Sequence, residues 1–193
     1  MTTALADDLD RTFDALVVAH QDRLYTIALR MLGDVGDAEE AAQDALVRAY
    51  RALASYDGDR IRELRLRPWL TTIVLNRCRS VAARRATRGP RPVSIDADGA
   101  RPPEPEAPPA AAPSEVAERH AERERWASRL HALPPAYRAA VIVRHVDGLS
   151  YPEAAAALGR PEGTVKAQVH RGVALLRTML EAEHRRELEE MTA

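Results

Sequence analysis

The strongest constraint on the fold of this chain of 193 residues is a proline-rich stretch in its middle. Eight of the 13 prolines lie in GPRPVSIDADGARPPEPEAPPAAAP, residues 89–113, where no apolar period of a helix or a strand is sustained. A mostly polyproline-like segment of this length reaches up to about 75 Å, at ~3.1 Å per residue. The stretch predicts a flexible linker between two small domains, residues 1–88 and 114–193.

Charge is distributed unevenly along the chain, although the formal net charge is only −1. Residues 1–57 hold 11 acidic and 5 basic residues, whereas residues 60–91 hold 10 arginines and a single acidic residue, Glu63. The linker region is acidic again, with six carboxylates and only Arg101 between Ser94 and Glu118. Neighbouring blocks of opposite charge predict two different partners, or else two solvated helix faces.

Both flanks of the linker have helical periodicity and nothing resembles a pair of strands, so the expected fold class is all-α. In the first flank an apolar stripe ends at Gly33, and a second helix follows, for which Asp37 is the expected N-cap. A third helix is predicted to begin near Pro68, where a proline in the first turn costs no hydrogen bond, and to run to Arg85. The first stripe consists of Phe13, Leu16, Val17, Leu24, Ile27, Ala28, Met31 and Leu32.

The second flank predicts a helix-turn-helix unit. Ser150 and Glu153 form an S-x-x-E capping box at the start of an alanine-rich helix, and Gly159 supplies the turn. The alanines lack bulk, so another helix can approach closely. The next helix, from Glu162 to about Arg177, has an outward face with no acidic residue from Gly163 to Arg177, and this face can enter a DNA major groove. Its apolar stripe is Val165, Val169, Val173, Leu176 and Leu180. A helical hairpin without DNA contact is the alternative.

Several function classes are disfavoured by what the sequence lacks. There is no Gly-rich phosphate loop and no HExxH motif, and the six histidines are scattered through different segments. Cys78 is the only cysteine, which excludes an internal disulfide and a cysteine-rich metal site. No basic leader and no apolar run of about 18 residues is present. We therefore expect a soluble cytoplasmic protein that is not an enzyme and has no metal, cofactor or small-molecule substrate.

The basic third helix carries the residue types that hold unpaired bases. Arginines bind phosphates, an aromatic ring such as Trp69 stacks on a base, and an amide such as Asn76 can read a base edge. The alternative is that Trp69 belongs to the core and that Asn76 is an ordinary solvated residue.

In three motifs, and in the family's order, the chain resembles a bacterial sigma factor of the extracytoplasmic-function (ECF) group of the sigma-70 family. The motifs are DAEEAAQDALVRAYRAL, RPWLTTIVLNRCRSVAARR and LPPAYRAAVIVRHVDGLSYPEAAAALGRPEGTVKAQVHRGVALLR. Members of this group have two helical domains that bind core RNA polymerase and direct it to two promoter elements. The resemblance implies that the first domain binds the core and reads and melts the minus-10 element, and that the second reads the minus-35 element.

The resemblance also implies which residues make these contacts. The coiled coil of the largest polymerase subunit would contact Asp37, Glu40, Gln43 and Asp44. The minus-10 element would contact Trp69, Asn76, Arg77, Arg79, Arg84 and Arg85. The minus-35 element would contact Gly163, Thr164, Lys166, Ala167, His170 and Arg171. The polymerase flap would hold the C-terminal domain, and the acidic linker would run through the RNA path of the polymerase.

The resemblance further implies a cognate anti-sigma factor that clamps the two domains and can hold the protein at the membrane. When it is not held there, the protein would be located at the nucleoid. Three features depart from the family pattern, one of which is Pro152, which replaces an ordinary helix former but fits the first turn. The segment YDGDRIRELRLRPW, residues 56–69, is longer and richer in arginine than the family's connector, and Ala167 stands where relatives often have a small hydroxyl residue. The alternative class is a dimeric helix-turn-helix operator-binding regulator, which does not explain an acidic face beside a separate basic helix.

Overall fold

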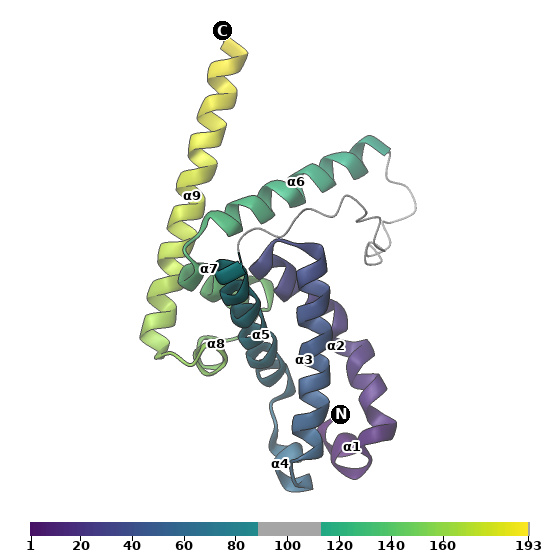
Figure 1. The fold of residues 1–193 in the computed structure, drawn as a ribbon. Helices are drawn as coiled ribbons and strands as arrows, with labels where there is room; N and C mark the ends of the chain where they lie inside the picture. Colours follow the sequence, from purple (N-terminus) through teal and green to yellow (C-terminus); the bar gives the residue numbers. More distant parts are fainter. Residues whose placement is uncertain (89–112, 193) are drawn as a thin grey trace.

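The computed structural model describes residues 1–88 and 113–192, and every regular element in those ranges is a helix (Figure 1). This confirms the all-α prediction. Of the predicted linker, residues 89–113, residues 89–112 lie outside the described residues, and Pro113 is the first residue of a helix. The N-terminal domain contains α1 (Thr2–Asp7), α2 (Leu9–Leu32), α3 (Val35–Ala54), α4 (Gly58–Glu63) and α5 (Leu66–Arg88). The C-terminal domain contains α6 (Pro113–Ala132), α7 (Pro135–Val141), the π-helical turn η1 (Ile142–Val146), α8 (Tyr151–Leu158) and α9 (Glu162–Thr192).

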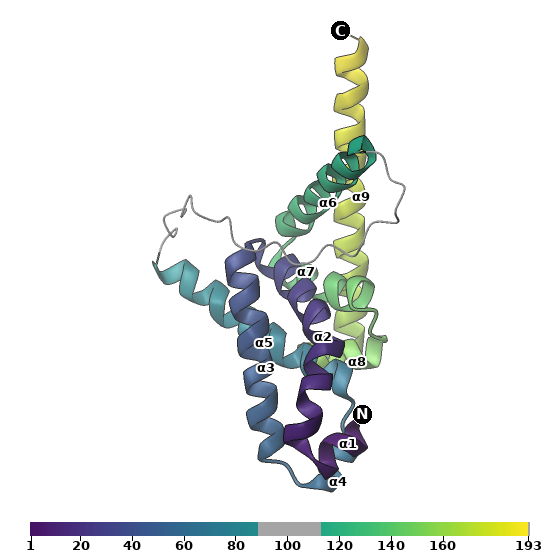
Figure 2. The same ribbon diagram turned by 90° about the vertical axis from the view of Figure 1, so that its right-hand side faces the viewer.

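In the N-terminal domain α2, α3 and α5 form a three-helix bundle, and α1 and α4 close one end of it (Figures 1 and 2). The predicted stripe of α2 supplies fully buried Leu16, Leu24 and Ile27, each of which contributes about 1.5–3 kcal/mol through burial. On the side of α3 that faces them the buried residues are mostly alanines, which lets the three helices pack closely.

The boundary between α2 and α3 corrects one prediction. Gly33 ends α2 in the left-handed conformation, with φ 72°, as a C-terminal glycine commonly does. The N-cap of α3 is Asp34, whose side chain accepts a hydrogen bond from the Asp37 backbone N–H at 2.8 Å. The prediction that Asp37 caps this helix is therefore wrong by one turn, because the extended backbone required of a cap occurs at Asp34.

The arginine-rich segment 56–69 is not only a loop, because it contains α4. Asp57 caps this short helix by accepting a hydrogen bond from the Arg60 backbone N–H at 2.8 Å. The sequence showed no helical period here, since six residues are too few for an apolar stripe to repeat.

The C-terminal domain contains the predicted helix-turn-helix unit, formed by α8 and α9. Both bonds of the Ser150 and Glu153 capping box are present, and Gly159 ends α8 in the left-handed conformation. Val165 and Val169 of α9 are buried, and Gly172 lets α9 cross α7 closely, since a Cβ there would lie 2.6 Å from a methyl group of Val141. The helix continues past the predicted end to Thr192.

The two domains pack directly against each other, with α5 lying on α8 and α2 on η1 and α6 (Figures 1 and 2). Leu70 and Val74 of α5 share one buried cluster with the small residues Ala154 and Ala157 of α8. The alanines therefore admit a helix of the other domain as well as the neighbouring α9.

Candidate promoter and polymerase interface

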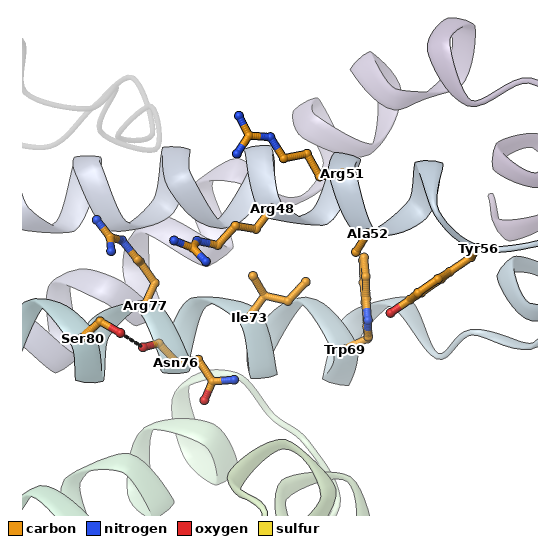
Figure 3. Close-up of a pocket in the computed structure, with 9 residues that line it drawn as sticks. All are labelled: Arg48, Arg51, Ala52, Tyr56, Trp69, Ile73, Asn76, Arg77 and Ser80. Carbon is orange, nitrogen blue, oxygen red and sulfur yellow. Dashed lines mark hydrogen bonds between the residues drawn. The ribbon is translucent and has the colours of Figure 1, made fainter.

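A pocket of about 480 Å³ opens between α3 and α5 (Figure 3). Its lining residues are Arg48, Arg51, Ala52, Tyr56, Trp69, Ile73, Asn76, Arg77 and Ser80. The aromatic rings of Tyr56 and Trp69 stand at one end, with centroids 6.3 Å apart and planes tilted by 58°. The guanidinium groups of Arg48 and Arg77 lie toward the other end.

This pocket combines the groups needed to hold an unpaired nucleotide. An aromatic wall replaces the stacking that an extruded base loses, an amide offers a donor and an acceptor, and arginines neutralise phosphates. Trp69 packs against the core cluster and lines the pocket, so the two interpretations offered for it are compatible. Asn76 is exposed, and its side-chain oxygen accepts a hydrogen bond from Arg79 Nη1 at 2.6 Å.

The sequence reasoning missed several residues of this pocket. Arg48 and Arg51 come from α3, of which only the acidic face was assigned a partner, and Tyr56 comes from the connection to α4. For the α5 side of the pocket the spacing was a usable signal, because Trp69, Ile73, Asn76 and Ser80 recur every three or four residues on one face of α5. No such signal pointed to the residues from α3 and the connection to α4.

The residues predicted for polymerase and for minus-10 DNA meet in a series of ion pairs between α3 and α5, here called the α3–α5 ladder. Arg77 Nη2 lies 2.9 Å from Glu40 Oε1, and Arg77 Nε lies 2.7 Å from Asp44 Oδ2. Arg84 Nη2 also reaches Glu40 Oε1, at 3.3 Å. Arg85 pairs with Asp37 and, at 3.3 Å, with Asp34.

The ladder extends to the pocket through Asp44. Its Oδ2 accepts a hydrogen bond from Arg48 Nε at 2.7 Å, so one carboxylate holds both Arg48 and Arg77 at the pocket wall. The predicted polymerase residue Gln43 is exposed on the same helix. Two surfaces that the sequence assigned to different partners are therefore one charge-balanced surface.

Unlike Arg77, Arg84 and Arg85, Arg79 forms no ion pair of the ladder and lies close to Arg160 of the C-terminal domain. Burial lowers the pKa of its guanidinium, and the nearby Arg160 lowers it further. Arg160 itself donates hydrogen bonds to Gln168 on α9 and to the backbone of Ala136 on α7.

The predicted minus-35 face of α9 is open to solvent. Its exposed residues include Gly163, Thr164, Lys166, Ala167, His170 and Arg171. Lys166 Nζ lies 2.7 Å from Glu162 Oε1, a pair within the first turns of the helix that raises the Lys166 pKa. The buried stripe on the opposite side of α9 holds this face outward.

Within residues 1–88 and 113–192, no group of three or more histidine, cysteine or acidic residues is arranged to hold a metal ion. Over the same ranges, no helix combines the length and the apolar character needed to cross a bilayer.

Comparison with known proteins matches both domains to one family. Residues 16–88 match Sigma-70 region 2, and residues 123–176 match Sigma-70, region 4. The ECF RNA polymerase sigma factor SigE of Mycolicibacterium smegmatis is 33% identical over 171 residues, a match that covers 88% of this chain and 62% of that protein. The ECF RNA polymerase sigma factor SigW of Bacillus subtilis is 31% identical over 180 residues, with 87% of this chain and 88% of SigW covered.

A solved structure extends the comparison to the fold. The sigma factor RpoE, solved in complex with the anti-sigma factor NepR from Bartonella quintana, is 25% identical to this chain. The two structures superpose with a TM-score of 0.66, and the match covers 89% of this chain and 98% of RpoE. With both sigma-70 regions present in order and SigW matched over 88% of its length, the chain belongs to the ECF group of RNA polymerase sigma factors.

Proposed function

We propose that this sigma factor binds core RNA polymerase through α3, reads the minus-10 element with the α3–α5 pocket, and reads the minus-35 element with α9. Residues 1–88 form the first functional unit, residues 114–193 form the second, and residues 89–113 link them. The factor acts stoichiometrically: it opens the promoter, and the polymerase performs the chemistry.

The pocket between α3 and α5 is the observation that carries this proposal. A minus-10 base leaves the duplex and stacks on Trp69, with Asn76 at its edge, while Arg77 and Arg79 approach the backbone beside it. Arg84 and Arg85 lie further along α5, and they exchange their carboxylate partners for flanking phosphates.

The second DNA surface is the exposed face of α9. Lys166, His170 and Arg171 reach base edges or phosphates in the major groove, and Gly163, Thr164 and Ala167 allow the backbone of α9 to come close. Ala167 contributes no polar contact, so base selection depends on the longer side chains.

The protein partners follow from the same surfaces. Asp37, Glu40, Gln43 and Asp44 on α3 meet the basic coiled coil of the largest polymerase subunit, and the flap holds the C-terminal domain. Because the relative RpoE was solved with an anti-sigma factor, we propose that an anti-sigma factor restrains this chain too. The protein then works at the nucleoid in the cytoplasm, or is held at the membrane by that inhibitor.

Run-off transcription tests the proposal. Core polymerase and this protein are mixed with fragmented genomic DNA, and the transcript starts are sequenced. Starts that need the protein and share two elements support it, and Trp69→Ala should abolish most of them. Lys166→Ala or Arg171→Ala should cost about 1–3 kcal/mol at one promoter position. Absence of starts together with tight duplex binding by the protein alone would favour an operator-binding regulator.

A further inference from the structure

A carboxylate from one domain is buried against the other domain where α5 meets α8. The Asp147 side chain follows η1 and has no exposed surface. Thr71 Oγ1 donates to Asp147 Oδ2 at 2.6 Å, Arg23 pairs with Oδ1, and Arg67 Nε lies 3.5 Å from Oδ1. The described partners of this carboxylate all belong to the N-terminal domain. We call this cluster of four residues the Asp147 junction.

Other contacts extend the junction in both directions. Arg65 Nη2 lies 2.8 Å from Glu153 on α8, and Arg67 donates a hydrogen bond to the backbone oxygen of Asp147. At the far side, Arg138 Nη1 donates to the Met31 backbone oxygen at 2.9 Å. Leu149 and Leu158 complete the shared apolar cluster with α5. An interface with a common core and a satisfied buried charge is a specific contact between the domains.

This closed arrangement is incompatible with reading two promoter elements, a requirement that rests on the proposed function. The minus-10 and minus-35 elements lie about 25 base pairs apart, which is about 85 Å at ~3.4 Å per base pair. In the structure α5, which carries the minus-10 surface, packs on α8, the helix that supports the minus-35 reader. The domains must therefore separate before both elements are read.

The arginine-rich segment that departs from the family pattern supplies much of this contact. Two of its arginines build their own domain: Arg62 pairs with Asp7 and Asp59, and Arg60 stacks over the Tyr56 ring at 3.7 Å. The other two, Arg65 and Arg67, reach the C-terminal domain. Arg60 and Arg62 therefore stabilise their own domain, whereas Arg65 and Arg67 contact the other one. DNA binding alone does not require contacts of this second kind.

We propose that these contacts form an intramolecular latch, in which Arg23, Arg67 and Thr71 hold Asp147 and Arg65 holds Glu153. The latch keeps the free protein in a closed, inactive form. Opening returns Asp147 and its arginine partners to water, so the latch releases when polymerase or promoter DNA binds the separated domains more tightly. Once open, Arg65 and Arg67 lie exposed near Trp69 and are free to bind promoter phosphates.

Distance measurements on the full chain test the latch. Labels are attached at Ala54→Cys on α3 and Ala174→Cys on α9, both exposed positions outside the proposed binding surfaces. The native Cys78 does not compete, because it is buried and burial raises the pKa of its thiol to about 12. The latch variants are Arg67→Gln and Asp147→Asn. The matched control is Arg62→Gln, which removes the same charge from the same segment but breaks a contact within one domain.

A single short distance is expected in the unmodified protein and in Arg62→Gln. Asp147→Asn should shift the closed-to-open ratio by about 100-fold, since it breaks a buried pair, and Arg67→Gln should shift it less because Arg67 is half exposed. Both latch variants should bind core polymerase more tightly, by about 10-fold if opening limits binding.

Three results would overturn the latch. One is an unchanged short distance in both latch variants; another is an open population equally large in Arg62→Gln. The third is a dimer, detected by light scattering, that the latch variants convert to a monomer, since the contact between α5 and α8 would then join two molecules. If the distances change as expected but polymerase affinity does not, the latch has no inhibitory role and that half of the inference fails. Failure of the proposed function is distinguishable, because no variant would then support promoter-specific starts, whatever the distances show.

Discussion

The α3–α5 ladder and the Asp147 junction use the same residue types in opposite settings. Several ladder side chains are well exposed, with Glu40 at 51% and Arg84 at 45%, and only Asp37, at 9%, is nearly buried, whereas Asp147 has no exposed surface. Exposed pairs contribute little and exchange partners at low cost, but breaking a buried pair strands a charge. The difference teaches that the ladder is suited to share its carboxylates and arginines with incoming partners, while the junction is suited to switch between two states.

The largest expected effect is at the junction. Asp147→Asn should lower the free energy of unfolding of the full chain by about 3 kcal/mol, because Arg23 and Thr71 lose their buried acceptor charge. Urea unfolding measures this value. The control is Asp44→Asn in the ladder, which should cost less than about 1 kcal/mol. Equal losses would mean that burial does not separate the two regions.

Trp69 lies between the two regions and gives the next largest effect. It lines the α3–α5 pocket and also a cavity of about 300 Å³ beside Pro152 and Glu153 at the domain contact. Trp69→Ala should therefore weaken binding of single-stranded minus-10 DNA to the holoenzyme by about 1–3 kcal/mol and also loosen the closed form. Fluorescence anisotropy measures the first effect and the label distance measures the second. Asn76→Ala should affect DNA binding alone.

Local features of the fold were predictable from the sequence, whereas most contacts across the domain boundary were not. The capping box at Ser150, the glycine at the end of α2 and the apolar stripes depend on residues near in sequence. Arg23 and Asp147 are 124 residues apart, and neither position carries a local sign of the other. The alanines of α8 predicted a close neighbour but could not say that α5 is one.

The candidate site was predictable in its residues but not in how they combine. Trp69 and Asn76 do line one pocket, while Arg48 and Arg51 were missed because the net charge of their helix hid them. The acidic and basic blocks were given to separate partners, although opposite charges on neighbouring helices of one small domain neutralise each other first. That pairing becomes visible only when α3 and α5 are placed side by side.

Lowering the pH should destabilise the Asp147 junction. It should leave the ladder largely unchanged, because the ladder contains no histidine. His20 lies beside the junction. Burial lowers the pKa of its imidazole, the positive charges of Arg23 and Arg67 lower it further, and the negative charge of Asp147 opposes the shift. When the domains separate the pKa returns toward ~6.5, so the closed form has its full stability above that pH and loses stability as the pH falls below it.

His131 at the second domain contact shifts in the same direction, through burial and then Arg138. The open population, measured by the label distance, should therefore rise from pH 7.5 to pH 5.5. Each histidine contributes at most one proton to this dependence, and His20→Gln should remove the His20 share. A profile that stays flat in the unmodified protein would contradict the assignment of these histidines to the closing interface.

The smallest expected effect concerns sharing within the ladder, and Glu40→Gln measures it. Glu40 holds Arg77 and Arg84, so neutralising it should let the free protein bind a single-stranded oligonucleotide about 0.5 kcal/mol more tightly. Up to two added phosphate contacts should also steepen the logarithmic salt dependence by at most ~1.4. Glu39→Gln is the matched control, since it removes the same charge one residue away. Core polymerase should bind Glu40→Gln more weakly, because the same carboxylate is proposed to meet it. If both variants gain DNA affinity equally, long-range charge alone is responsible and the ladder does not hold its arginines back from DNA.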